Sequence, residues 1–160
     1  MIIGLAHTAV CVPDLDAAIA WYESALGLRV LSPPYSMEGE AIEHDMGELV
    51  PSPVVVRAAI VGFDVGDHVL EIIEYPSARG AATATGTVLD TGLTHVGVVC
   101  DDLEGERDRL VAAGATALTS QVASIAGLST AWVRDPFGII WILLEKRHAE
   151  RPYWHQHAPT

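Results

Sequence analysis

The chain has 160 residues, of which half are hydrophobic and only 19% are charged, and its formal net charge is −12. This composition is typical of a folded globule with room for one sizeable core or two small modules. The acidic balance, with Lys146 as the single lysine, argues against nucleic acid and anionic membranes as partners. No apolar run reaches the ~20 residues that span a bilayer. Cys11 and Cys100 lie in apolar runs without zinc spacing, so we expect a reducing, cytoplasmic setting.

The opening of the chain recurs 88 residues later. The stretch "GLAHTAVCVPDLD" aligns with "GLTHVGVVCDDLE", and this alignment places His7 opposite His95. Each copy reads as a strand followed by a turn into a helix. Asp14 and Asp102 fall at the expected helix starts, where a carboxylate accepts hydrogen bonds from free backbone N–H groups.

Each helix start is followed by an apolar face and a glycine stop. The apolar positions recur at spacings of three or four, as a helix requires. In the first copy they are Leu15, Ile19, Tyr22 and Leu26 before Gly27, and in the second they are Leu103, Leu110 and Val111 before Gly114. A strand then follows in each copy, "LRVL" in the first and "ATALT" in the second.

Two further strands close each copy, "VVVRAAIVGF" and "DHVLEIIEY" in the first and "STAWVRD" and "GIIWILLEK" in the second. These strands align at an offset of 71, so the first copy is 17 residues longer. We predict an α+β fold of two tandem βαβββ modules. The predicted parts are a first module at 1–77 with a long inserted loop at 33–53, a linker at 78–91, a second module at 92–146 and a C-terminal tail at 147–160. The composition of the tail favours disorder or packing against a partner, and its two prolines argue against a regular element.

Two βαβββ halves that open with "GLxH" and a "DL" helix start resemble the vicinal oxygen chelate superfamily. The phrases "AIAWYESALGLRVL", "LEIIEYP" and "RDPFG" strengthen the resemblance, which covers roughly residues 3–146. This group includes glyoxalase I, methylmalonyl-CoA epimerase, extradiol dioxygenases, thiol transferases for fosfomycin and bleomycin-binding proteins. The resemblance implies a curled mixed sheet that lines a cleft, as in glyoxalases. One fold hosts many chemistries, so it does not fix the reaction.

The resemblance also implies where a metal would bind. In metal-using relatives the ligands come from the first and last strands of each module. Carried over by position, these places are His7, Glu71, His95 and Ile142, of which the first three can bind a metal. Two imidazoles and one carboxylate suit Fe(II), and they would also accept Zn²⁺, Co²⁺, Ni²⁺ or Mn²⁺. A lone histidine in an apolar strand is more often structural, but two at equivalent positions of a repeat favour ligation.

The fourth place raises the question of whether Glu145 replaces the missing carboxylate. Relatives with the pattern DPxGxxxE carry it seven residues after the aspartate, where this chain has Ile142. Residues three apart on a strand point to opposite faces, so only a bulge would bring Glu145 round. We therefore predict that Ile142 lines the cleft and that Glu145 is a solvated strand end.

The other candidate residues have weaker support. His44 in the inserted loop could reach a substrate as a lid closes, although an ordinary loop histidine is the commoner case. Arg57 lies in an apolar strand and needs an anion, which could be a substrate carboxylate or a structural acid. Glu74 is expected in solvent. Together with Ile142, His44 and Arg57 form the predicted substrate-binding set.

Two classes of function remain open from the sequence. In the first, the protein is an epimerase, isomerase or lyase in which a metal at His7, Glu71 and His95 stabilises an enolate or related oxyanion of a small substrate, with Glu71 as the catalytic carboxylate. A ring-cleaving dioxygenase is a variant of this class. In the second, it is a metal-free drug-binding protein with an apolar cleft. A homodimer is expected in either case.

Overall fold

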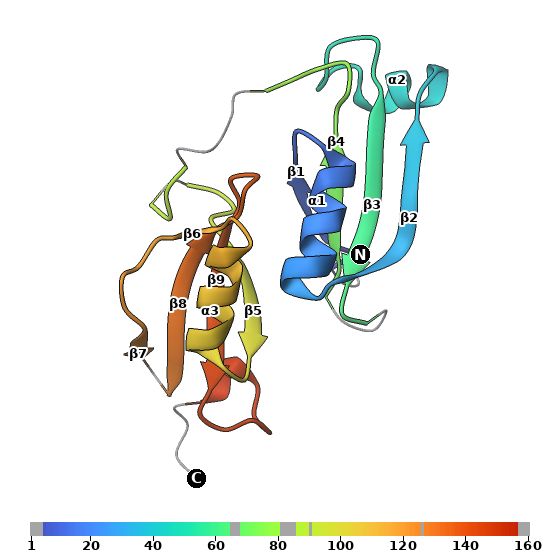
Figure 1. Ribbon diagram of the computed structural model, residues 1–160. Helices are drawn as coiled ribbons and strands as arrows, with labels where there is room; N and C mark the ends of the chain where they lie inside the picture. The colour runs from blue at the N-terminus through green and yellow to red at the C-terminus, as the bar shows by residue number, and fades with distance from the viewer. Residues whose placement is uncertain (1–4, 65–67, 81–85, 90, 126, 157–160) are drawn as a thin grey trace. The chain divides into compact units, whose positions relative to one another are not determined.

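The computed structural model describes residues 5–64, 68–80, 86–89, 91–125 and 127–156. The chain divides into two compact units, Met1–Ala81 and Ala82–Thr160. Each unit has one mixed sheet covered by a helix (Figure 1). The predicted α+β class is confirmed. Each unit contains the predicted strand, helix and three strands, with an additional helix at Glu40–Met46 in the first unit and an additional short strand at Ala123–Ile125 in the second.

The first unit contains a four-stranded sheet in the order β1-β4-β3-β2. Its elements are β1 (Thr8–Cys11), α1 (Leu15–Trp21), a π-helical turn (Tyr22–Leu26), β2 (Arg29–Met37), α2 (Glu40–Met46), β3 (Val56–Gly62) and β4 (Leu70–Glu74). Strand β1 runs parallel to β4, and β3 is antiparallel to both β4 and β2. Strand β2 is therefore an edge of this sheet.

Helix α1 begins and ends as the sequence predicts. Asp14 accepts a hydrogen bond from the backbone N–H of Ala17 at 2.9 Å, and Gly27 closes the following turn with a left-handed φ of 70°. The wider π turn shifts the buried position at the end of the helix from Leu26 to Ala25. Leu15, Ile19 and Tyr22 are buried as expected.

The segment 33–53, predicted as a loop, contains regular structure. Its first residues continue β2, and "EAIEHDM" forms α2, with acidic residues in the first turn and His44 in the last, which suits the helix dipole. Ile42 packs with Val54 and Val56 in a small core that also includes Met46, Val50, Ile73 and Tyr75. Glu43 accepts hydrogen bonds from the backbone of Val54 and the hydroxyl of Ser52. The segment is thus anchored to the sheet by its own core.

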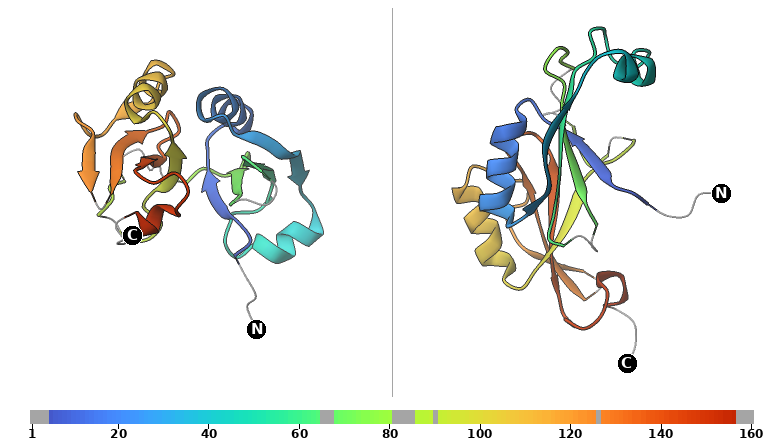
Figure 2. Two further views of the ribbon diagram at one scale, coloured as in Figure 1. Left: turned by 90° about the horizontal axis from the view of Figure 1, so that it is seen from below. Right: turned by 90° about the vertical axis from the view of Figure 1, so that its right-hand side faces the viewer.

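The second unit contains a sheet in the order β5-β9-β8-β6, with β7 paired to β8. Its elements are β5 (Val96–Cys100), α3 (Leu103–Ala112), β6 (Thr116–Ala117), β7 (Ala123–Ile125), β8 (Leu128–Arg134), β9 (Ile140–Lys146) and a 3₁₀ turn (Tyr153–His155). Figure 2 shows α1 and α3 each lying along the sheet of its own unit. Asp102 caps α3 through the N–H of Gly105 at 3.1 Å.

The turn between β8 and β9 explains the phrase "RDPFG". Asp135 is only 4% exposed, and one of its carboxylate oxygens accepts hydrogen bonds from the backbone N–H groups of Phe137 and Ile139, each at 2.9 Å. The other oxygen accepts a bond from the indole Nε1 of Trp141, also at 2.9 Å. The aspartate therefore fixes the turn and orients the largest side chain of this core.

The tail differs from the expectation of a disordered or partner-bound segment. Gln156 is 3% exposed, and its amide donates to the carbonyl oxygens of His148, Arg151 and Pro152 at 3.0–3.1 Å. The Gln156 backbone lies against Gly127, where an added Cβ would meet its carbonyl oxygen at 2.8 Å. The tail as far as residue 156 is thus part of the second unit. His157 lies outside the described residues.

Candidate functional site

The first unit brings His7 and Glu71 together. His7 directly precedes β1, and the register pairs Ala9 with Glu71, so the two side chains emerge from neighbouring strands. His7 Nε2 lies 3.1 Å from Glu71 Oε2. The imidazole is 44% exposed and the carboxylate 15% exposed. An acid so well covered requires a compensating partner.

Tyr35 is a third member of this group that the sequence analysis did not identify. Its hydroxyl donates a hydrogen bond to Glu71 Oε1 at 3.0 Å, so each carboxylate oxygen has its own partner. Partial burial, together with the hydrogen bond to Glu71 and its charge, raises the pKa of the Tyr35 phenol. The phenol therefore remains a protonated donor at neutral pH.

The geometry of the His7–Glu71 pair fits two neighbouring ligands of one metal ion. Metal–ligand bonds to imidazole nitrogen and carboxylate oxygen are about 2.0–2.2 Å, which puts adjacent ligand atoms roughly 2.8–3.1 Å apart in an octahedral site and roughly 3.3–3.6 Å apart in a tetrahedral one, a combined range of about 2.8–3.6 Å. The observed 3.1 Å lies in this range. Neither unit, over its described residues, gathers three or more His, Cys, Asp or Glu side chains into a metal-binding group. The first unit by itself thus offers two ligands.

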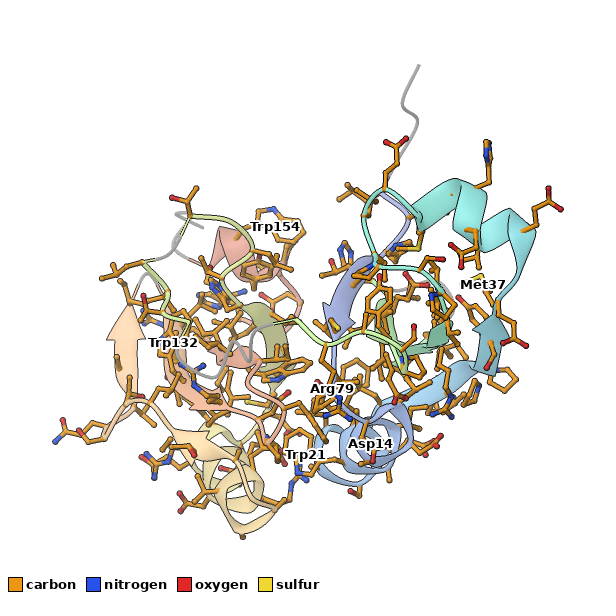
Figure 3. The ribbon with its side chains drawn as sticks, turned by 90° about the horizontal axis from the view of Figure 1, so that it is seen from above. Asp14, Trp21, Met37, Arg79, Trp132 and Trp154 are labelled. Atoms are coloured by element: carbon orange, nitrogen blue, oxygen red, sulfur yellow. The ribbon has the colours of Figure 1, made fainter. Side chains whose placement is uncertain are left out.

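In the second unit His95 lies just before β5 and contacts two neighbours. Its Nδ1 is 2.8 Å from the hydroxyl of Thr94, and its ring meets Trp132 edge to face with centroids 4.9 Å apart. Trp132, labelled in Figure 3, pairs across β8 and β9 with Ile142. A Cβ added at Gly97 would lie 3.4 Å from Ile142. Ile142 therefore shares one sheet face with His95, Gly97 and Trp132.

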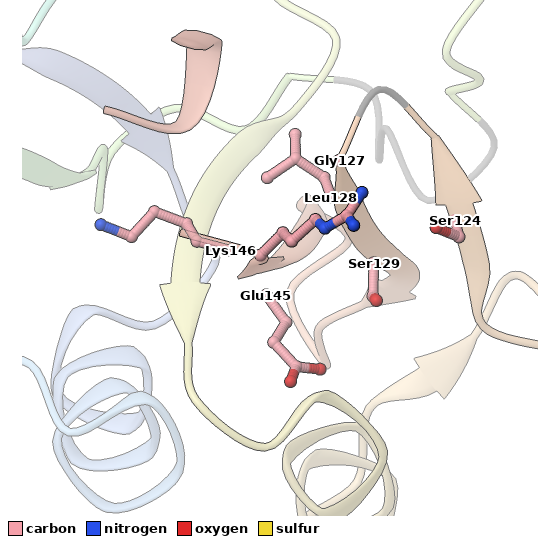
Figure 4. Close-up of a pocket in the computed structure, with 7 residues that line it drawn as sticks. Ser124, Gly127, Leu128, Ser129, Glu145 and Lys146 are labelled. Carbon is pink, nitrogen blue, oxygen red and sulfur yellow. The ribbon is translucent and has the colours of Figure 1, made fainter. Parts of the chain in front are cut away.

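Glu145 lies on the opposite face of β9. The pairing of β9 with β8 runs from Ile140 to Lys146 without a register shift, so no bulge turns Glu145 round. It shares its face with Trp141 and Leu143, which are buried on the side of α3. Figure 4 shows Glu145 beside Ser129 in a pocket of about 300 Å³. Glu145 is half-buried in this pocket rather than fully solvated, but it is on the wrong face to replace Ile142.

Arg57 and Glu74 face α1, on the side of the first sheet opposite Glu71. The register places Arg57 directly opposite Glu74, and their side chains bond at 2.8 Å. Arg57 also binds Asp16 at 3.0–3.1 Å, while Glu74 accepts a bond from the N–H of Leu15 at 3.2 Å. Glu74 is only 16% exposed, so the expectation that it is solvated was wrong. The network ties the start of α1 to the sheet.

This arrangement predicts that Arg57→Ala lowers stability without changing metal affinity. The substitution leaves Glu74 partly buried without its cation, and we expect a loss of about 1–2 kcal/mol in the free energy of unfolding by urea. Arg109→Ala is the matched control, because the Arg109–Glu106 pair is more exposed and should contribute less than ~0.5 kcal/mol. Equal losses in both variants, or weaker Zn²⁺ binding by Arg57→Ala alone, would contradict this assignment.

The remaining candidates lie apart from the His7–Glu71 pair. His44 is exposed on α2, on the side away from Ile42 and Met46, which pack into the small core. His68 is also exposed. Burial raises the pKa of the Cys100 thiol to about 11, with the nearby acids adding to the effect, and it raises that of Cys11 as well. Neither cysteine has the lowered pKa of a nucleophile.

Comparisons with solved structures agree with this architecture. A glyoxalase family protein from Bacillus cereus matches with a TM-score of 0.80 and 21% identity, over 92% of this chain and 97% of that chain. Glyoxalase I from Zea mays matches with a TM-score of 0.63 and 18% identity over 92% of this chain, which spans only 46% of the maize protein. The fosfomycin resistance protein FosX from Listeria monocytogenes matches with a TM-score of 0.55 and 14% identity, over 91% and 94% of the two chains. At these identities the likeness establishes the fold alone.

The sequence comparisons identify the family. No curated protein matches the chain. Among the described residues, no helix is both long and apolar enough to cross a membrane. Residues 4–143 match the Glyoxalase/Bleomycin resistance protein/Dioxygenase superfamily, which is the group that the repeated "GLxH" openings resemble. The chain therefore belongs to the glyoxalase/bleomycin resistance protein/dioxygenase superfamily.

Proposed function

We propose that this protein is a glyoxalase-like metalloenzyme that acts on a small oxygenated molecule. The observation that carries the proposal is the 3.1 Å approach of His7 Nε2 to Glu71 Oε2, because both the atoms and their spacing suit neighbouring ligands of a divalent cation. His95 is the proposed third ligand. The contact between Thr94 and its Nδ1 leaves Nε2 as the nitrogen for the metal.

The proposed chemistry is an isomerase, epimerase or lyase reaction. A divalent metal, when bound, supplies Lewis-acid stabilisation of negative charge on substrate oxygens. In a proton transfer a substrate C–H bond breaks, its electron pair stays on the substrate, and the proton passes to the carboxylate of Glu71. Tyr35 holds Oε1 of this carboxylate and so keeps its orientation fixed.

Metal content tests the proposal and separates it from the metal-free alternative. We expect one Zn²⁺ per chain in the purified protein or after titration with Zn²⁺, and loss of binding in His7→Ala and His95→Ala. A chain that neither retains nor binds a divalent metal would overturn the proposal. It would favour a ligand-binding protein, for which the apolar pair of Trp132 and Ile142 beside His95 provides support.

The cytoplasmic location and the homodimer stay predictions.

Ile142→Glu should tighten metal binding. The side chain shares its sheet face with His95, so a carboxylate there would add a charge and a fourth ligand. We expect Zn²⁺ affinity to rise at least roughly tenfold, which corresponds to ~1.4 kcal/mol. Activity should fall, because the carboxylate fills a position left for substrate oxygens.

Val99→Glu is the control for a general electrostatic effect. Val99 is half-exposed and lies on the same face of β5 as Gly97. It pairs with Leu144, two residues along the strand from the Gly97–Ile142 pair. It adds the same charge without occupying a ligand position, so Zn²⁺ affinity should change little. Equal tightening by Val99→Glu and Ile142→Glu would remove the support for Ile142 as the fourth position.

A further inference from the structure

Strand β2 contains two register shifts against β3, the first between Val30 and Ser32 and the second between Ser32 and Tyr35. The second shift sets the orientation of Tyr35 relative to Ser32. The register pairs Ser32 with Ile60 and Tyr35 with Ala58, so β2 advances three residues while β3 advances two. The extra residue is a bulge at Pro33–Pro34. Prolines lack an N–H group and are tolerated at such positions on an edge strand, which β2 is.

The bulge brings Tyr35 onto the face of Glu71. Ile60 and Ala58 are two residues apart on β3 and share one face, and Ile60 is the direct partner of Glu71 on β4. Ser32 and Tyr35 are three residues apart and would point to opposite sides of a regular strand. With one residue bulged out, both point to the same side, and the Tyr35 hydroxyl is directed at Glu71.

The tyrosine reaches Glu71 across the strand between them. Neighbouring strands are about 4.8 Å apart, so β2 and β4 are separated by about 10 Å. A phenol is the longest neutral side chain that ends in a hydroxyl, and it closes this gap at a hydrogen-bond distance of 3.0 Å. The residue opposite Tyr35 on β3 is Ala58, whose small side chain leaves room for the ring.

Burial of the Tyr35 hydroxyl does not by itself account for its hydrogen bond to Glu71. Tyr35 is 37% exposed, so water could satisfy its hydroxyl if Glu71 were absent. For Glu71 the consequence is larger, because Oε1 is held by Tyr35 and Oε2 is directed at His7. A carboxylate held at both oxygens cannot rotate freely, which lowers the entropy lost when a metal binds.

We propose that Tyr35 is the positioning residue of the metal site, and that it holds Glu71 so that only Oε2 is presented to the cation. The inference rests on the proposed metal site and extends it to a residue outside the set of ligands. Tyr35 acts through Glu71 and does not itself bind the metal.

A double-mutant cycle with Zn²⁺ as the probe tests this role. Zn²⁺ affinity is measured by competition with a chelating dye for the wild-type protein, Tyr35→Phe, Glu71→Ala and the double variant. Tyr35→Phe should weaken Zn²⁺ binding by about 10–100-fold, as is usual for the hydrogen-bond partner of a ligand. In the Glu71→Ala background, where the acceptor of the Tyr35 bond is absent, it should have less than a twofold effect, because Tyr35 acts only through the carboxylate. Tyr153→Phe removes a hydroxyl from an exposed tyrosine of the second unit and is the control.

The outcomes separate this inference from the proposal on which it depends. If the wild-type chain binds Zn²⁺ and Tyr35→Phe changes the Zn²⁺ affinity by less than twofold, the proposed role of Tyr35 is wrong and the metal site is unaffected. The same result follows if Tyr35→Phe weakens binding equally with and without Glu71, since the effect would then be structural. A wild-type chain that binds no Zn²⁺ overturns the metal site and the role of Tyr35 with it. Thermal unfolding of Tyr35→Phe within about 2 °C of the wild type shows that the fold is intact.

Discussion

Glu71→Gln is expected to reduce Zn²⁺ affinity by more than roughly 100-fold, beyond the 10–100-fold that partners of ligands contribute. Glutamine has the same shape as glutamate, and its oxygen can still accept the bond from Tyr35. It lacks the negative charge that strengthens an oxygen ligand of a divalent cation, and with its oxygen bonded to Tyr35 it directs its NH2 group toward His7. Turnover should be lost together with the metal, because the same carboxylate is the proposed proton acceptor.

The control is Glu145→Gln, which makes the same chemical change at the end of the equivalent strand in the second unit. Glu145 lies on the α3 side of its sheet, so Zn²⁺ affinity should be unchanged and stability should stay within ~0.5 kcal/mol. Isothermal titration and elemental analysis of both variants provide the measurement. Loss of metal in Glu145→Gln with retention in Glu71→Gln would reverse the assignment.

The second large effect is expected at Asp135, where Asp135→Ala should lower the free energy of unfolding by about 3 kcal/mol. Two backbone N–H groups and the indole of Trp141 would lose their acceptor, and each such loss costs about 1 kcal/mol or more. Trp141 is 1% exposed, so water cannot replace the bond to its Nε1 without opening the core. The corresponding fall in the midpoint of thermal unfolding is roughly 6–12 °C for a chain of this size.

Urea unfolding followed by circular dichroism measures this loss. Asp108→Ala is the matched control, because Asp108 is an exposed carboxylate that pairs only with its neighbour Arg107 among the contacts described for it. We expect the control to stay within ~0.5 kcal/mol of the wild type. If Asp135→Ala costs less than 1 kcal/mol, the turn between β8 and β9 does not depend on its aspartate.

The sequence was sufficient for the features that depend on local pattern. Helix caps at Asp14 and Asp102, the glycine stop at Gly27 and the repeated modules all follow from spacing and residue type. The opposite faces of Ile142 and Glu145 also follow, because alternation along a strand is a local property. The pairing of β8 with β9 confirms that alternation.

Features that depend on strand register were beyond the sequence. Glu74 was expected in solvent because it ends a strand, but the register places it opposite Arg57 and below the N–H of Leu15. Tyr35 was overlooked because the segment 33–53 was predicted as a loop, whereas β2 extends to Met37 and brings the Tyr35 hydroxyl to Glu71. Helix α2 is only seven residues long, and its stability depends on packing against Val54 and Val56 rather than on helical propensity.

The bulge at Pro33–Pro34 sets which face of the sheet each later residue of β2 occupies. Between Ser32 and Tyr35 the number of residues, rather than their identity, determines which side chains meet Glu71. A substitution at either proline preserves that count, whereas an insertion or deletion of one residue exchanges the two faces for the rest of the strand. In comparisons within the family, gap placement in this edge strand therefore carries information about the Tyr35–Glu71 contact that residue identity does not.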